Sequence, residues 1–170
     1  MRGRVVVGAN GSPGSLTAMH RAAAEARARE AELWVVLAWQ PPGGGLGGRN
    51  SCVPSVLSAC RDTADERLRG ILDAFGAGRP GVSPAGLTVR GTPGAALVDA
   101  VRDGGDLLVV GTGSRAPLLR ALRPSVARYC LAHAPCPVLA VPPSPLQADL
   151  DAVRRRQAWR MPLDVRELTR

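Results

Sequence analysis

The 170-residue sequence is long enough to bury one sizeable core, and its 45% hydrophobic and 21% charged residues are typical of a soluble globular protein. All 22 basic residues are arginines, because the sequence contains no lysine, and they give a formal net charge of +8. The missing lysine excludes a Walker-type phosphate loop, Schiff-base chemistry and a phospho-receiver site that needs an ammonium group.

The arginines are dispersed along the chain, which favours a GC-rich genome over nucleic-acid binding as the origin of the positive charge. No apolar run approaches the roughly 18 residues of a membrane span, and the first residues lead into a short strand without the pattern of a signal peptide. We therefore expect a cytoplasmic protein with no membrane partner, and nucleic-acid binding stays open as the less favoured interpretation of the charge.

Cysteines and histidines show no metal-binding pattern. The residues concerned are Cys52, Cys60, Cys130, Cys136, His20 and His133. No two cysteines form a CxxC pair, and no cysteine has zinc-ligand spacing with a histidine. We expect no metal site, and thiols that stay reduced and structural.

Strand and helix patterns alternate along the chain. Five short runs of β-branched and aliphatic residues are typical of strands buried on both faces: 4–9, 32–39, 87–90, 106–111 and 136–141. Helical spacing and start signals predict four helices: one beginning at Ser15, then 55–75, 92–105 and 124–133. This order predicts an α/β fold with a doubly wound, five-stranded parallel sheet and helices on both faces.

The second helix is expected to turn one apolar stripe toward the core. Its members are Val56, Leu57, Leu68, Ile71 and Leu72. The Pro/Gly-rich segment 40–50 shows no regular pattern. Residues 143–170 are charged and poor in strand formers, so they are predicted to be a partly helical C-terminal extension and not a second domain.

Three glycine-rich or small-residue stretches follow predicted strands, at 8–12, 38–39 and 111–115. In an open parallel sheet, ligands bind outside the carboxyl ends of the strands. Glycine there lets the backbone approach a ligand, a following helix start offers N–H groups to an anion, and Arg115 could add a charge-assisted contact. Such glycines also serve simply to make turns, so spacing alone leaves a nucleotide site and a plain turn equally open.

Other α/β schemes fit less well. The stretch GANGSPG lacks the GxGxxG run of a dinucleotide site, and no GxSxG elbow supports a hydrolase triad. A phospho-receiver would need acidic residues where this chain has Asn10 and Arg90. No paired carboxylates suit acid–base chemistry, so the sequence assigns no catalytic residue and, at most, a weak hydrolytic activity.

The chain resembles the universal stress protein family in five segments that occur in order over about residues 3–142. They read VVVGANGSPGS, LWVVLAWQPP, GTPGAALVDAV, DLLVVGTGSR and SVARYCLAHAPCPVLAV. The resemblance implies that residues 1–142 are a universal stress protein domain with a Rossmann-like, adenine-nucleotide alpha hydrolase-like fold. It also implies a homodimer joined along the last strand, 136–141.

Many members of this family bind ATP through a loop of the form G-x2-G-x9-G-[ST]. On this chain the loop positions fall on Gly111, Ser114, Pro124 and Ser125. The resemblance implies the following nucleotide-binding residues: Gly8, Asn10, Ala38, Val110, Gly111, Ser114, Arg115, Ser125 and Val126. Two of the three loop glycines are replaced, although the spacing is intact.

The replacements differ in physical weight. Ser114 adds a Cβ and a hydroxyl that could donate to phosphate. The family places an aspartate near the ribose at the position of Asn10. The asparagine keeps a hydrogen-bond acceptor but would bind a Mg²⁺ ion more weakly. Pro124 removes an N–H, and a hydrogen bond to a charged group contributes roughly 1.5–3 kcal/mol. We expect a pocket for an adenine nucleotide (ATP) with weakened phosphate affinity.

Two functions are consistent with these residues. One is a stress-response regulatory protein whose dimer responds to ATP. The other is a family member that binds no ATP and acts as a dimeric interaction module for an unidentified protein partner. The second reading rests on the arginines around Trp159 in the extension, which also fit an ordinary charged terminal helix.

Overall fold

One parallel sheet forms the centre of the molecule. The computed structural model describes residues 3–41, 53–78, 81–112 and 125–145. The strands are β1 (Arg4–Gly8), β2 (Glu32–Trp39), β3 (Pro84–Arg90), β4 (Leu107–Gly111) and β5 (Val138–Val141), in the order β3-β2-β1-β4-β5. All four pairings are parallel. The predicted fold class is confirmed.

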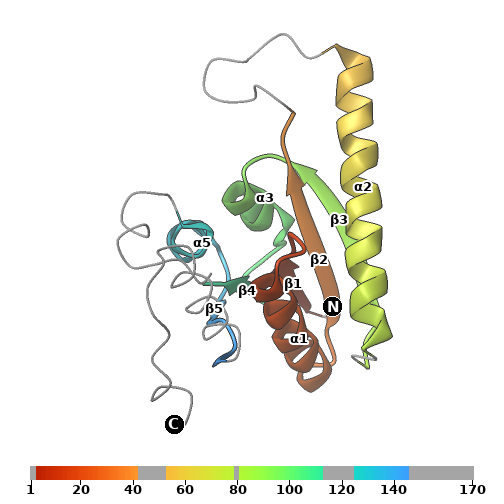
Figure 1. The fold of residues 1–170 in the computed structure, drawn as a ribbon. Coiled ribbons are helices and arrows are strands. Elements are labelled where there is room, and N and C mark those ends of the chain that lie inside the picture. The colour runs from red at the N-terminus through yellow and green to blue at the C-terminus, as the bar shows by residue number, and fades with distance from the viewer. Residues whose placement is uncertain (1–2, 42–52, 79–80, 113–124, 146–170) are drawn as a thin grey trace, which may run out of the picture.

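Helices cover both faces of the sheet, as Figure 1 shows. They are α1 (Pro13–Ala28), α2 (Pro54–Ala77), α3 (Pro93–Ala100) and α5 (Val126–His133). Helices α1 and α2 pack on one face, and α3 and α5 pack on the other. Right-handed crossovers explain this division, because the chain moves from β1 toward β3 and then returns past β1 to β4 and β5.

Strand alternation divides the core into two clusters. Val5 and Val7 of β1 face α1 and α2, whereas Val6 faces α3 and α5, and all three side chains are fully buried. β4 alternates in the same way, with Val109 on the first face and Val110 on the second. β1 and β4 therefore lie in the interior as continuous apolar runs, as the sequence predicted.

Element ends differ from the predicted ones where local contacts decide them. β3 begins at Pro84 and not at residue 87, because it pairs with β2 along the full length from Leu33 to Trp39. α3 ends at Ala100, well short of residue 105. The segment after it turns so that Asp106, 4% exposed, accepts hydrogen bonds from the backbone N–H groups of Arg4 and Arg102, both at 2.9 Å.

The long helix α2 is buried only from Ala64, near its midpoint, onward. Its buried residues are Ala64, Leu68, Ile71 and Phe75. The first turns extend past the sheet, as Figure 1 shows, and Val56 is 43% exposed. The prediction that Val56 faces the core is therefore wrong, because the sheet ends before the helix does. Leu57 and Leu72 are half-buried.

No helix among the described residues is long and apolar enough to cross a bilayer. The described part of the chain likewise contains no group of three or more metal-ligating side chains. The predicted segment 40–50 is described only at its first two positions, and the predicted C-terminal extension only as far as residue 145.

The packing of α2 predicts that substitutions in its buried half destabilise the protein more than substitutions in its exposed first turns. We expect Phe75→Ala to lower the free energy of unfolding by about 3–5 kcal/mol, because it opens a cavity under a side chain that is 1% exposed. Val56→Ala, in the same helix, should change it by less than about 0.5 kcal/mol. Urea denaturation of both variants measures the difference, and equal effects would contradict this account of α2.

Candidate nucleotide site

The order of the strands reverses between β1 and β4, and a crevice opens there at their carboxyl ends. α1 leaves β1 toward one face, while the chain after β4 returns to the opposite face. The last residues of these two strands are Gly8 and Gly111. Crevices of this kind are where open α/β sheets bind ligands.

A cavity of about 330 Å³ occupies this crevice. Its lining residues are Gly8, Ala9, Asn10, Ser12, Gly14, Ser15, Val36, Ala38, Pro93, Leu97, Val110, Gly111 and Val126. The volume lies at the small end of the range for ligand sites, about 300–1,000 Å³. The cavity therefore suits one small molecule.

Most of the residues implied by the resemblance meet in this cavity. Six of them line it: Gly8, Asn10, Ala38, Val110, Gly111 and Val126. Ser125 is the N-cap residue of α5 and lies next to the lining residue Val126. Ser114, Arg115 and Pro124 lie outside the described residues.

Two further lining residues, Ala9 and Ser12, belong to the stretch 8–12 that the sequence placed at the crevice. Five others were not predicted: Gly14, Ser15, Val36, Pro93 and Leu97. The sequence carries a partial indication for two of them, Val36 and Pro93. Val36 precedes Ala38 by two positions, so strand alternation places both on one face. Pro93 opens a helix that the sequence predicted, but nothing in the sequence links that helix start to the same crevice.

The floor of the cavity is apolar. Gly8, Val36, Ala38 and Val110 lie on the sheet face covered by α3 and α5, and Leu97 of α3 packs over them. A Cβ at position 8 would lie 3.0 Å from Cδ1 of Leu97, so glycine is needed there to keep that space open. An apolar slot of this kind suits the flat face of a nucleobase.

The ends of three helices surround the cavity. Its lining includes Ser12 and Gly14 at the start of α1, Pro93 at the start of α3 and Val126 at the start of α5. The Ser12 side chain accepts the N–H of Ser15 at 3.2 Å. The N-cap residues of α3 and α5 make no such side-chain bond. The starts of three helices, where the helix dipole is positive, therefore meet at this crevice.

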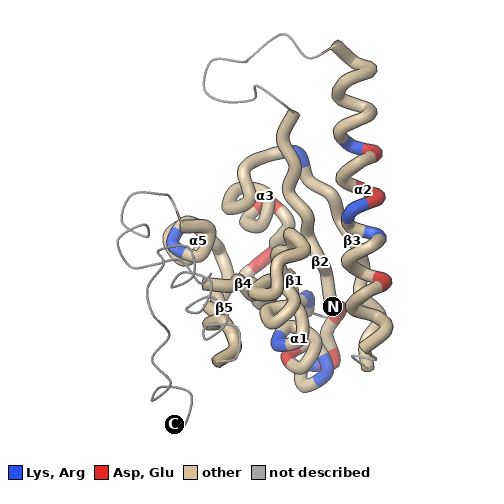
Figure 2. Tube along the Cα trace, viewed as in Figure 1, with Lys and Arg blue, Asp and Glu red and all other residues tan. Residues whose placement is uncertain are grey.

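No carboxylate offsets this positive potential. The first turns of α1, α3 and α5 contain no acidic residue, and none of the lining residues is charged. In Figure 2 the charged residues lie mainly on the outer helices α1 and α2. The described part of the cavity thus favours an anion and presents groups that bind, with no acid–base pair.

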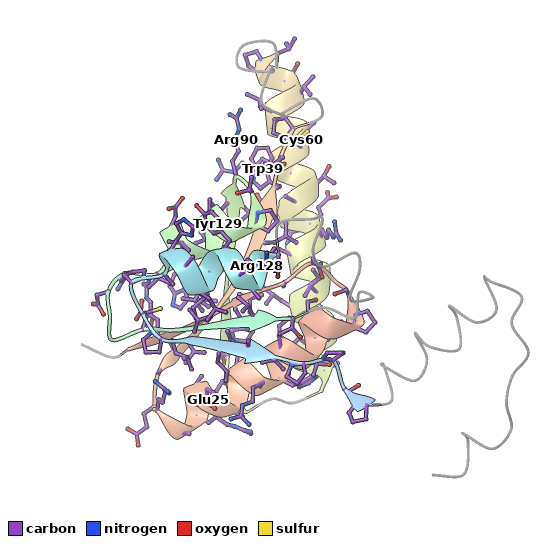
Figure 3. The ribbon with its side chains drawn as sticks, turned by 90° about the vertical axis from the view of Figure 1, so that its left-hand side faces the viewer. Glu25, Trp39, Cys60, Arg90, Arg128 and Tyr129 are labelled. Atoms are coloured by element: carbon purple, nitrogen blue, oxygen red, sulfur yellow. The ribbon has the colours of Figure 1, made fainter. Side chains whose placement is uncertain are left out.

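Two close contacts fix the geometry of the helix ends. A Cβ on Gly111 would lie 3.3 Å from the carbonyl oxygen of Gly14, so β4 and the first turn of α1 approach closely where Gly111 has no side chain. A Cβ on Gly94 of α3 would lie 2.7 Å from the ring of Tyr129 of α5. Figure 3 shows Tyr129 on α5. These contacts set the spacing of the helix ends around the cavity.

Two thiols, those of Cys130 and Cys136, belong to the core cluster between the sheet and helices α3 and α5. Burial raises the pKa of the thiols of Cys130 and Cys136 above the ordinary value. Both groups are protonated near neutral pH and pack as small apolar side chains in the cluster below α3 and α5.

The chain was compared with known proteins, and a universal stress protein family model matches residues 1–142. A universal stress protein in complex with cAMP is 30% identical (TM-score 0.63, covering 84% of this chain and 98% of that one). A family protein from Burkholderia pseudomallei is also 30% identical (TM-score 0.57, 83% and 96%). The Archaeoglobus fulgidus universal stress protein in complex with dAMP is 20% identical (TM-score 0.51, 83% and 98%) and shows the same fold.

No curated protein matches the chain. The family model covers every element of the sheet, and the two relatives at 30% identity extend over more than four-fifths of the chain. The resemblance found in the sequence is therefore confirmed, and the chain belongs to the universal stress protein family.

Proposed function

We propose that this universal stress protein binds an adenine nucleotide in the cavity between β1 and β4 and acts as a nucleotide-responsive regulator. One observation carries the proposal: a neutral cavity with an apolar floor is surrounded by the positive ends of three helices. A base fits the floor, and an anionic phosphate fits the helix ends.

The relatives support the ligand class. A relative that is 30% identical was crystallised with cAMP, and a more distant one with dAMP. Adenine is common to both ligands. In this chain we assign the base to the floor beside Ala38 and Val110, and a 5′-phosphate to the side of Gly111 and Val126. The stress-response role and the cytoplasmic location expected from the sequence belong to the same proposal.

We propose further that phosphate is held weakly and that ATP has little advantage over a monophosphate. Pro124 has no N–H to donate, and Ser114 replaces a second loop glycine. Asn10 is a weaker Mg²⁺ ligand than an aspartate, so Mg²⁺ should add little to ATP binding. This chemistry supports binding more than hydrolysis.

A second function is favoured by the edge of the sheet. Among the described residues β5 pairs only with β4 and is the last strand of the order, so no described strand pairs with the N–H and C=O groups of its other edge. Val138 and Leu139 are half-buried and Ala140 is exposed. We propose that a second copy of the chain pairs along this edge to form a homodimer, which could serve as an interaction module with or without nucleotide.

A bulky residue on the cavity floor tests the nucleotide site. We expect Ala38→Trp to abolish AMP and ATP binding, because an indole would occupy the space of the base. Titration calorimetry of nucleotide-free protein measures this. Ala28→Trp, on an exposed alanine at the far end of α1, is the matched control and should bind as the parent does. No binding by the parent at millimolar nucleotide would overturn the proposal and leave the interaction module.

Restoring a backbone N–H at position 124 tests the proposal that Pro124 weakens phosphate binding. We expect Pro124→Gly to tighten ATP binding by about tenfold or more, from the worth of one hydrogen bond to a charged group. AMP binding should change less, since fewer phosphates are available to use the new N–H. Calorimetry with and without Mg²⁺ follows both ligands, and an unchanged ATP affinity would refute the role assigned to Pro124.

The dimer edge is tested on its exposed residue. We expect Ala140→Glu to convert the dimer to monomer while leaving the fold intact, because the side chain is exposed in one subunit and paired subunits would bring like charges together. Light scattering gives the mass, and circular dichroism checks the fold. Ala28→Glu is the control. A parent protein that is monomeric, or an Ala140→Glu variant that stays dimeric, would exclude this edge.

A further inference from the structure

An arginine on the outer helix α2 is bonded to the loop that forms one rim of the cavity. Nη2 of Arg67 donates to the backbone carbonyl of Asn10 at 2.5 Å. One turn further along the same helix, Ile71 lies next to Gly11, whose φ of +73° places it in the left-handed region. α2 therefore holds the β1–α1 loop from outside, with a guanidinium group beside the residue that lines the cavity.

This guanidinium has no carboxylate partner among the described residues. Four other arginines, Arg4, Arg21, Arg29 and Arg61, make ion pairs with carboxylates. Arg67 instead bonds a neutral carbonyl, and its side chain is exposed. The residues three and four positions away on α2, where a helical ion-pair partner would stand, are Thr63, Ala64, Gly70 and Ile71. No described carboxylate therefore pairs with its charge, and within the described residues its other N–H groups remain available to a ligand.

Asn10 lines the cavity, and its side-chain amide supplies a second donor group. Its Oδ1 accepts the backbone N–H of Ser12 at 2.9 Å, which fixes the side chain. Its Nδ2 makes no hydrogen bond within the described part of the chain and can donate. The Asn10 amide and the guanidinium that bonds the backbone carbonyl of the same residue both donate to an oxyanion, whereas a carboxylate at position 10 would repel one.

In a bound nucleotide, the ribose hydroxyls would lie near Asn10 and Arg67. In the proposed site, which this inference rests on, the 5′-phosphate lies toward Gly111 and Val126 at the end of β4. The 2′- and 3′-hydroxyls leave the ribose ring on the side opposite C5′, so they face the loop after β1. We propose that Asn10 and Arg67 form a second anion subsite, which recognises a phosphate esterified to the 2′- or 3′-hydroxyl of an adenine nucleotide.

The test compares one nucleotide with its doubly phosphorylated forms by calorimetry of the full chain. AMP, adenosine 3′,5′-bisphosphate and adenosine 2′,5′-bisphosphate are titrated in turn, and the two bisphosphates distinguish the position. We expect one of them to bind about fivefold or more tightly than AMP, as for an exposed charge pair of about 1 kcal/mol. This preference should weaken as salt is raised.

Variants assign the preference to these side chains. Arg67→Gln and Asn10→Asp should each reduce the ratio of bisphosphate to AMP affinity to about one or below. Arg67→Lys should keep part of it. Arg69→Gln removes the same charge from an exposed arginine of α2 that makes no ion pair or hydrogen bond among the described residues, and should keep the full ratio. Thermal unfolding checks that the variants remain folded.

The outcomes separate the two proposals. If AMP binds and neither bisphosphate binds more tightly, the subsite is refuted and the proposed function stands. If Arg67→Gln weakens all three ligands equally, the ratio is unchanged, and Arg67 only positions the loop. If neither AMP nor a bisphosphate binds, the proposed function fails and the subsite fails with it.

Discussion

The pairing of β1 with β4 is the constraint on which the rest of the structure depends. It places Val5, Val6 and Val7 beside Leu107, Leu108 and Val109 in the middle of the sheet, where neither strand meets water. Because the chain reaches β4 only after returning from β3, the helices on the two sides of this pair lie on opposite faces. The crevice at the ends of β1 and β4 follows from that arrangement, and so does the convergence of three helix starts around it.

Two groups are missing from the described lining of the crevice, namely side chains at two glycines and acidic residues at the helix starts, and both absences shape what it can bind. Glycines at positions 8 and 111 leave room that a Cβ would fill, because a Cβ at these positions would lie 3.0 Å from the Leu97 side chain and 3.3 Å from the Gly14 carbonyl oxygen. The absence of acidic residues from the first turns leaves the positive ends of the helices uncompensated. Both properties favour a ligand that is flat and apolar at one end and anionic at the other, which describes a nucleotide.

Much of this could be predicted from the sequence, for identifiable reasons. Apolar runs predict buried parallel strands, so the sheet was predicted from the residues alone. The resemblance to the universal stress proteins supplied the six lining residues at strand ends and at the start of α5. Val36 and Leu97 were missed because they look like ordinary core residues, and only the tertiary arrangement places them at a cavity. The bond from Arg67 to Asn10 joins residues 57 positions apart, and no local pattern indicates it. The exposed start of α2 was missed for a related reason: helical spacing predicts a face but not where the sheet beneath it ends.

The central claim is that an adenine nucleotide binds at the reversal of strand order between β1 and β4. The most direct measurement is a titration of ¹⁵N-labelled protein with AMP, following the backbone amide signals by NMR. The account predicts saturable shifts at Gly8, Gly111 and the first turn of α5, with Gly86 in β3 unaffected. Shifts absent at saturating AMP, or confined to residues away from this crevice, would contradict it.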